Sequence, residues 1–332
     1  MKKVLCKAVA VMALLAIVAA VGLAGGAAEP GPGSVVVYSA GPGGLAENIA
    51  QGFEAETGIR VEMFQATTGA VLGRLEAEAD NPHADIVVLA SWPAAFSLLE
   101  NGWLEQYRPA NAGLLHDGWN HDDYFFGYSA SALGVTYNTD HISDPGSDWS
   151  DYADPRFRGI VAMPDPSASG SALDFLAGYA LNYNEDAWQL FQQLRDNDLE
   201  LAGANRPALD SVITASNYIV LAGVDYMAYG VMAQGNPIDI YYPRSGTVVN
   251  PRPAMMTSFG RNQENARKFM DYLLSDEAQR MVADVYIIPG RRDIPVHPDR
   301  VGMDQIPVLD LDWDWMAENQ SEINDRFQQI FR

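Results

Sequence analysis

The segment SVVVYSAGPGGLAENIAQGFEAETGIRVEMF, residues 34–64, changes its hydrophobic pattern twice. Its first six residues are mostly β-branched, which is typical of a buried strand. Leu45, Ile49 and Phe53 then recur at helical spacing, and Gly58 stands where a glycine commonly ends a helix. The last six residues form a second predicted strand. Strand, helix and strand in this order predict a parallel sheet covered by helices, with ligands bound beyond the carboxyl ends of the strands.

The same alternation continues along the chain. We predict further helices over 70–79, 93–101, 171–180 and 185–195, and further strands over 84–89, 159–163 and 220–224. Two long strands, 125–137 and 239–249, flank the central block and are expected to cross between two lobes. The pattern therefore predicts an α/β protein whose two lobes each contain a mixed, mostly parallel sheet flanked by helices.

The N-terminus has the layout of a secretory signal peptide. Basic residues precede an apolar run over 8–23, and small residues follow it over 24–28. The apolar run is about 16 residues long, whereas a spanning helix needs roughly 20, so an uncleaved anchor is disfavoured. We predict a signal peptide over 1–28, cleaved after either Ala24 or Ala28, and a linker over 29–33. The expected location is the periplasm or the cell exterior.

Cysteine and charge limit the classes of function. The single cysteine, Cys6, precedes the apolar run, so we expect a soluble mature chain with no disulfide, no Cys-based metal site and no lipid anchor. The formal charge is −22, and it becomes −25 when the three lysines of residues 1–28 are removed. Such a charge repels nucleic acid and anionic lipid. Lys268 is the one remaining lysine, and the acids are scattered, which we interpret as adaptation to high salt. An ordinary acidic secreted protein is the alternative, and full folding in very low salt would favour it.

Two loops rich in Ser and Thr precede predicted helices, one in each lobe. They contain Ser169-Gly170-Ser171 and Thr67-Thr68-Gly69. Helix N-termini offer free N–H groups and the positive end of the helix dipole, so both loops are candidate anion sites, although plain N-capping explains them too. Asp225, beside Tyr226 at the end of a predicted strand, is a candidate acceptor for a ligand ammonium or a structural N-cap. The candidate ligand-binding residues are Ser39, Thr67, Thr68, Gly69, Ser91, Trp92, Ser169, Gly170, Ser171, Asp225 and Tyr226.

Signals for metal binding or catalysis are weak. Residues 116–123 contain two histidines and several aspartates, but they lie in a predicted loop, and we interpret them as a solvated loop. The sequence has no Gly-x-Ser-x-Gly elbow, no His-Glu-x-x-His and no phosphate-binding loop ending in Gly-Lys-Ser/Thr. We therefore expect a protein that is not an enzyme and that needs no cofactor.

Short stretches with a characteristic order span nearly the whole mature chain: Val36–Ser39, Ala84–Val87, Leu133–Asp140, Met163–Pro166 with Ser169–Gly170, Asp225–Tyr226, Gly246–Val249 and Phe269–Ser275. Together they resemble periplasmic solute-binding proteins of ABC importers. The similarity is to the ferric-iron and phosphonate branch, extracellular solute-binding protein family 1. The resemblance implies a type II periplasmic-binding-protein fold that closes on its ligand at a hinge and delivers it, as a monomer, to a membrane permease and ATPase. We expect one lobe to contain 34–128 and 245–290, and the other 129–244 and 291–332.

The resemblance also bears on the ligand. Ferric-binding members carry two adjacent tyrosines where this chain has Asp225-Tyr226, and their histidine and glutamate would fall near Pro42 and Ala90. The metal ligands are therefore mostly replaced, while the serine loop at the anion position is kept. We expect a small organic anion or zwitterion, either a phosphonate such as 2-aminoethylphosphonate or a sugar phosphate, with Asp225 facing an amine or hydroxyl. The alternatives are a ferric-iron receptor, a polyamine or thiamine receptor, and a protein that presents its ligand to a membrane sensor.

Overall fold

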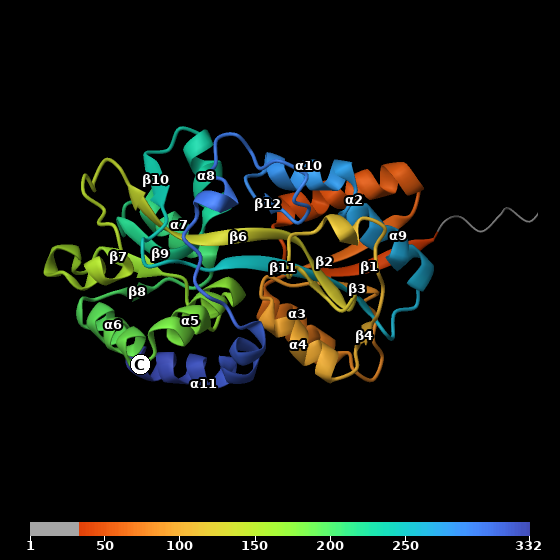
Figure 1. The fold of residues 1–332 in the computed structure, drawn as a ribbon, viewed down its shortest axis with the longest axis horizontal. Coiled ribbons are helices and arrows are strands. Elements are labelled where there is room, and N and C mark those ends of the chain that lie inside the picture. The colour runs from red at the N-terminus through yellow and green to blue at the C-terminus, as the bar shows by residue number, and fades with distance from the viewer. Residues whose placement is uncertain (1–32) are drawn as a thin grey trace, which may run out of the picture. The chain divides into compact units, whose positions relative to one another are not determined.

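The computed structural model describes residues 33–332, so the predicted signal peptide lies outside the described residues. Residues Ser34–Arg332 form one compact α/β unit (Figure 1). Within this part of the chain, no helix combines the length and the apolar character that a membrane crossing requires.

The first sheet follows the predicted pattern of alternating strands and helices. Strand β1 (Ser34–Ser39) pairs in parallel with β2 (Arg60–Gln65) on one side and with β3 (Ile86–Val88) on the other. The helices between and after these strands bury their apolar faces against the sheet; they are α2 (Gly43–Thr57), α3 (Thr68–Ala77) and α4 (Pro93–Glu100). All six elements lie within a few residues of their predicted positions.

One long strand belongs to both sheets. The first half of β6 (Phe125–Asn138) pairs antiparallel with β11 (Val249–Thr257), from Phe125 opposite Met255 to Ala132 opposite Val249. Its second half pairs antiparallel with β9 (Ile219–Val224) and β10 (Ile238–Tyr241). Figure 1 shows β6 and β11 running between the part that contains β1, β2 and β3 and the part that contains β9 and β10. The predicted crossing strand over 125–137 is therefore confirmed.

The second predicted crossing strand, over 239–249, is wrong. The structure instead has the short β10, which ends at Tyr241, and β11, which begins at Val249. Pro243 and Gly246, the latter at φ 100°, separate the two strands. Pro251 and Pro253 lie inside β11, and the pairing register shifts between Arg252 and Pro253. Prolines argue against a central strand in a sequence, which is why the pattern did not reveal β11.

The second sheet is built on β9, which pairs in parallel with β7 (Val161–Met163), and β7 pairs with β8 (Glu200–Leu201). Its helices are α5 (Gly170–Tyr183), α6 (Glu185–Asp196), α7 (Asn205–Ile213) and α8 (Asp225–Ala233). The C-terminal helix α11 (Trp313–Phe331) packs against both α5 and α4, so it contacts elements of both sheets. The remaining elements are β4 (Leu104–Glu105), β5 (Asn120–His121), α9 (Gln263–Leu273), α10 (Asp276–Asp284), β12 (Ile288–Pro289) and four short 3-10 helices.

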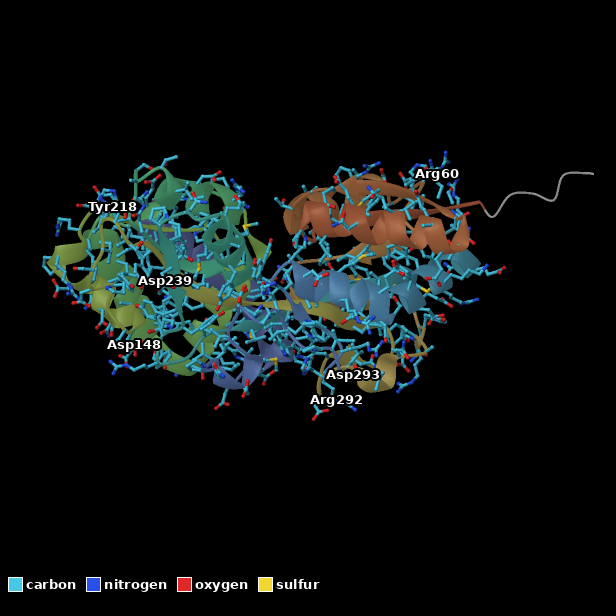
Figure 2. The ribbon with its side chains drawn as sticks, turned by 90° about the horizontal axis from the view of Figure 1, so that it is seen from above. Arg60, Asp148, Tyr218, Asp239, Arg292 and Asp293 are labelled. Carbon is cyan, nitrogen blue, oxygen red and sulfur yellow. The ribbon has the colours of Figure 1, made fainter. Side chains whose placement is uncertain are left out.

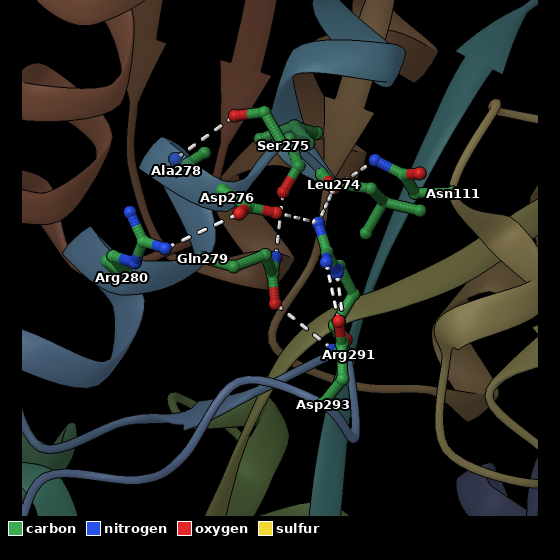
Figure 3. Close-up of polar contacts among 10 residues, drawn as sticks. Asn111, Leu274, Ser275, Asp276, Ala278, Gln279, Arg280, Arg291 and Asp293 are labelled. Carbon is green, nitrogen blue, oxygen red and sulfur yellow. Dashed lines mark hydrogen bonds and ion pairs between the residues drawn. The ribbon is translucent and has the colours of Figure 1, made fainter.

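After β12 the chain is anchored by the buried Arg291 (Figure 3). Its guanidinium lies 2.8 Å from Asp276 and 2.7 Å from Asp293, and it donates to the carbonyl of Leu274. Its backbone N–H donates to Gln279 on α10. These contacts attach the returning chain to the helices that cover the first sheet.

Figure 2 shows the same division of the chain. The labelled Arg292 and Asp293 lie in the half that contains Arg60, whereas Asp148, Tyr218 and Asp239 lie in the other half. The exact residues at which one lobe passes into the other, which we placed at 128, 244 and 290, stay a prediction.

Candidate functional site

A cavity of about 210 Å³ lies where five helices begin. Its lining includes residues from the first turns of α2, α3, α5, α7 and α8. Helices α2 and α3 belong with the first sheet, and α5, α7 and α8 with the second. The first turn of a helix has N–H groups without intrahelical partners, and the dipole makes that end positive. Five such ends around one cavity create a local environment that favours an anion.

Hydroxyl groups cap two of these helices. The Thr67 hydroxyl accepts a hydrogen bond from the backbone N–H of Ala70 in α3 at 3.4 Å. The Ser169 hydroxyl accepts one from the N–H of Ala172 in α5 at 3.3 Å. Both residues therefore act as N-caps, and both also line the cavity.

Asn205 fixes the serine loop. Its Nδ2 donates to the Ser169 hydroxyl at 2.9 Å and to the Ser171 hydroxyl at 3.0 Å. Its Oδ1 accepts from the backbone N–H of Val224 at 3.2 Å, just before α8 begins. The starts of α5, α7 and α8 are thus joined through one side chain that the sequence did not single out.

The two helix starts with predicted anion loops approach each other closely. Thr68 accepts a hydrogen bond from the N–H of Ala90 at 3.1 Å, which fixes its hydroxyl. A Cβ placed on Gly170 would lie 3.1 Å from both the Thr68 hydroxyl and the Ser91 Cβ. These contacts would be tighter than most real Cβ contacts, so a glycine at residue 170 favours the close approach of α5 to α3.

Arg252, on β11, is the most informative residue of the cavity and was missed by the sequence prediction. The residue is only 3% exposed. One guanidinium nitrogen, Nη2, donates to the Ser131 hydroxyl at 3.1 Å, but Nε and Nη1 have no hydrogen-bond partner within residues 33–332. The guanidinium carbon lies 5.2 Å from the centre of the Tyr226 ring. An arginine between two prolines in an unpredicted strand gave no usable sequence signal.

The charge of the lining is positive. Arg252 and Arg206 line the cavity, and no Asp or Glu residue of the described part of the chain, 33–332, does. Arg206 is exposed and pairs with Asp210 at 2.9 Å, so Arg252 carries the unpaired positive charge. The cavity therefore differs in sign from the acidic chain as a whole.

The structure brings together six of the predicted site residues and places five elsewhere. Thr67, Thr68, Ser169, Gly170, Ser171 and Tyr226 line the cavity; Ser39, Gly69, Ser91, Trp92 and Asp225 do not. Ser39 accepts from the N–H of Gly41 and thereby shapes the loop before α2. Ser91 and the backbone of Trp92 donate to the buried Asp174 on α5, at 2.6 Å and 3.2 Å.

Asp225 has protein partners instead of the ligand amine that we expected from the sequence. Its carboxylate is fully buried, and Arg300 lies 2.9 Å from it. The hydroxyl of Tyr242 donates to the same carboxylate oxygen at 2.9 Å, and the other oxygen accepts from the N–H of Tyr226. The carboxylate therefore points away from the cavity, and we correct its expected role.

The described residues also lack a converging set of metal ligands. Across residues 33–332, no group of three or more His, Cys, Asp or Glu residues is placed to hold a metal ion. The two histidines of residues 116–123, the segment rich in possible metal ligands, instead pack against aromatic rings. His116 contacts Trp119, and His121 contacts Phe125. Pro42 and Ala90, which stand near the expected positions of the ferric ligands, line the cavity.

Residues 81–319 match the family described as bacterial extracellular solute-binding protein. The chain belongs to this family. Its members are substrate-binding components of transporters and not enzymes, so the expected class of function is confirmed.

Relatives of known name agree with the expected branch of the family. A putative 2-aminoethylphosphonate-binding periplasmic protein of Salmonella typhimurium is 24% identical over 255 residues, which cover 73% of each chain. Iron uptake protein A2 of Synechocystis is 26% identical over 274 residues, covering 75% of this chain and 74% of the relative. The resemblance to the ferric-iron and phosphonate branch is thus confirmed. This solute-binding protein is similar both to a protein named for phosphonate binding and to one named for iron uptake.

The fold is also shared with solved structures. The periplasmic binding protein AfuA of Actinobacillus pleuropneumoniae, with fructose-6-phosphate bound, superposes with a TM-score of 0.83. The match covers 90% of this solute-binding protein and 99% of the other chain at 21% identity. The predicted type II periplasmic-binding-protein fold is therefore confirmed.

Proposed function

We propose that this solute-binding protein captures a small organic phosphate or phosphonate outside the cytoplasm and presents it to a membrane permease and ATPase. The observation that carries the proposal is the guanidinium of Arg252. A buried charged donor without a partner costs free energy, because it has lost its water and gained nothing in return. An anionic ligand in the cavity would supply the missing acceptors to Nε and Nη1.

The helix starts support the same ligand class. A phosphoryl or phosphonyl group has three acceptor oxygens, and the first turns of α3 and α5 both present N–H groups and hydroxyls in the lining of the cavity. Water is largely displaced when such a cavity closes, so local donors outweigh the negative charge of the distant surface. This explains how a strongly acidic protein can bind an anion.

The volume and charge of the cavity argue against several alternatives. A cavity of about 210 Å³ is smaller than the roughly 300–1,000 Å³ of sites for drug-sized ligands, so it suits a compact ligand. Polyamines and thiamine are cations, and the cavity offers them no carboxylate.

Direct iron binding is also poorly supported. Tyr226 is the one phenol in the lining, and burial raises its pKa, although Arg252 opposes this rise. A phenolate is harder to form in such a place, and no carboxylate or imidazole in the lining would complete the coordination.

A calorimetric titration of the mature chain, residues 29–332, in high salt tests the proposal. Sugar phosphates and phosphonates are expected to bind, while spermidine, thiamine and ferric citrate are not. Arg252→Gln should weaken binding, whereas Arg60→Met, at an exposed ion pair far from the cavity, should not. Binding of ferric iron alone, with a phenolate-to-metal absorption band, would overturn the ligand class and leave the family assignment intact.

Export by the predicted signal peptide is part of the same proposal. The family is extracellular, and the segment 1–28 has the expected layout. Mass spectrometry of the exported protein should find a first residue after Ala24 or Ala28, and sedimentation should find a monomer. Retention of residues 1–28 in a membrane fraction would contradict this.

A further inference from the structure

We propose that the cavity discriminates against ligands that carry an ammonium group, so that hydroxyl-bearing phosphonates and phosphate esters bind in preference to aminoalkylphosphonates. This inference rests on the proposed function and narrows its substrate class. It arises from what the lining offers: many hydrogen-bond donors, positive charge, and few free acceptors.

The cavity offers an ammonium group no counter-charge. Among residues 33–332, no carboxylate lines it. Asp225 is the carboxylate nearest in sequence to the lining residues. It is fully buried, forms an ion pair with Arg300 and accepts a hydrogen bond from Tyr242. An ammonium moved from water into the cavity would therefore lose hydration without gaining a counter-charge.

The aromatic ring of Tyr226 already has a cation beside it. Tyr226 is the one aromatic residue in the lining, and an aromatic face can bind a cation. The guanidinium of Arg252 already lies 5.2 Å from the centre of that ring. A ligand ammonium near the same ring would meet a positive charge, and the interaction between like charges is repulsive at this range.

The polar side chains of the lining are arranged to donate. Asn205 uses its Oδ1 to accept from Val224, and its Nδ2 donates to Ser169 and Ser171. The Ser169 hydroxyl accepts from Asn205 and from Ala172, so in its 3.2 Å contact with the Ser171 hydroxyl it is the donor. Ser171 then accepts from both Asn205 and Ser169, and its own O–H is left to donate. A hydroxyl or an anionic oxygen on the ligand can use such donors, whereas an ammonium, which has no acceptor, cannot.

Two ligands of nearly equal size test the inference: 2-hydroxyethylphosphonate and 2-aminoethylphosphonate, titrated calorimetrically into the mature protein at neutral pH in the same salt. Only the terminal group differs, neutral in the first and positively charged in the second. We expect the hydroxyl compound to bind at least about tenfold more tightly.

The variant Asn205→Asp tests the same inference by changing the protein instead of the ligand. It keeps the acceptor for the Val224 N–H and adds a carboxylate to the lining. The ratio of the two affinities should fall toward one or invert, and this ratio is independent of any uniform loss of affinity. Circular dichroism verifies that the variant is folded.

The outcomes separate the two proposals. Equal or tighter binding of 2-aminoethylphosphonate by the unaltered protein would overturn the selectivity and leave the proposed function standing. An unchanged ratio in Asn205→Asp would also overturn it, because the charge of the lining would then not set the preference. Failure of both compounds and of all sugar phosphates to bind would overturn the proposed function, and the selectivity with it.

Discussion

Asp225 and Arg300 form an ion pair of 2.9 Å in which both side chains are fully buried. Arg300 also donates to the carbonyl of Tyr286, and Asp225 accepts from Tyr242, so neither charge lacks a hydrogen bond. Asp225 also accepts a hydrogen bond from the backbone N–H of Tyr226, which lines the cavity. A carboxylate that the sequence suggested as a ligand partner is thus part of the scaffold.

The first prediction concerns this pair. Arg300→Met should destabilise the protein by about 3–5 kcal/mol, because it leaves the Asp225 carboxylate buried without its counter-charge. The double variant Asp225→Asn with Arg300→Met should lose clearly less stability than Arg300→Met alone, since neither charge then remains. Urea unfolding measures both. A double variant that loses as much as the sum of its single variants would contradict this account.

The ion pair between Asp225 and Arg300 could not be predicted from the sequence. Its members are 75 residues apart, and no local pattern in the chain indicates that they meet. By contrast, β1, α2 and β2 were predictable because their hydrophobic periods are regular and Gly58 marks the helix end. The serine and threonine loops were found for the same reason, since capping residues have a local signature. Arg252 was missed because the prolines beside it hid its strand.

The second prediction separates binding from stability at Arg252. Arg252→Met should weaken binding of the organic phosphate about 100-fold, the loss expected for two hydrogen bonds to a charged group. The unliganded protein should become more stable by about 1 kcal/mol, because removing the two unpaired donors, Nε and Nη1, outweighs the loss of the hydrogen bond to Ser131. Calorimetry gives the first value and urea unfolding the second.

The conservative variant Arg252→Lys should bind with intermediate affinity, because lysine keeps the charge but not the planar arrangement of donors. If Arg252→Met instead lost several kcal/mol of stability together with binding, the arginine would be mainly a structural residue.

The third prediction concerns the close approach at Gly170. Gly170→Ala should lower ligand affinity about tenfold, because its Cβ would press on Thr68 and Ser91 at 3.1 Å and hold the two helix starts apart. Gly69→Ala is the matched control, since it lies in the first turn of α3 and its Cβ would meet nothing within 4 Å. The control should keep its affinity and gain about 0.4–1 kcal/mol of stability. Equal affinities in the two variants would show that the contact at residue 170 does not limit binding.

The fourth prediction is a pH dependence that originates at Asp174, which joins α5 to the chain after β3 through Ser91 and Trp92. Burial raises the pKa of Asp174 well above its ordinary value, and the hydrogen bonds from Ser91 and Trp92 oppose this only in part. Between the ordinary pKa, about 3.9, and the raised one, the folded protein holds a proton that the unfolded chain has lost. The contribution of this group to the free energy of unfolding therefore falls as the pH rises through that interval.

Asp174→Asn removes this titration and isolates it from the other carboxyl groups of the chain. Urea unfolding of both proteins from pH 4 to pH 8 should show the unaltered protein losing stability relative to the variant, by at most about 1.4 kcal/mol per pH unit. The difference should become constant once the pH exceeds the raised pKa. Parallel curves over the whole range would mean that Asp174 titrates alike in the folded and unfolded states, and that its three donors, including Gln320, fully offset the cost of burial.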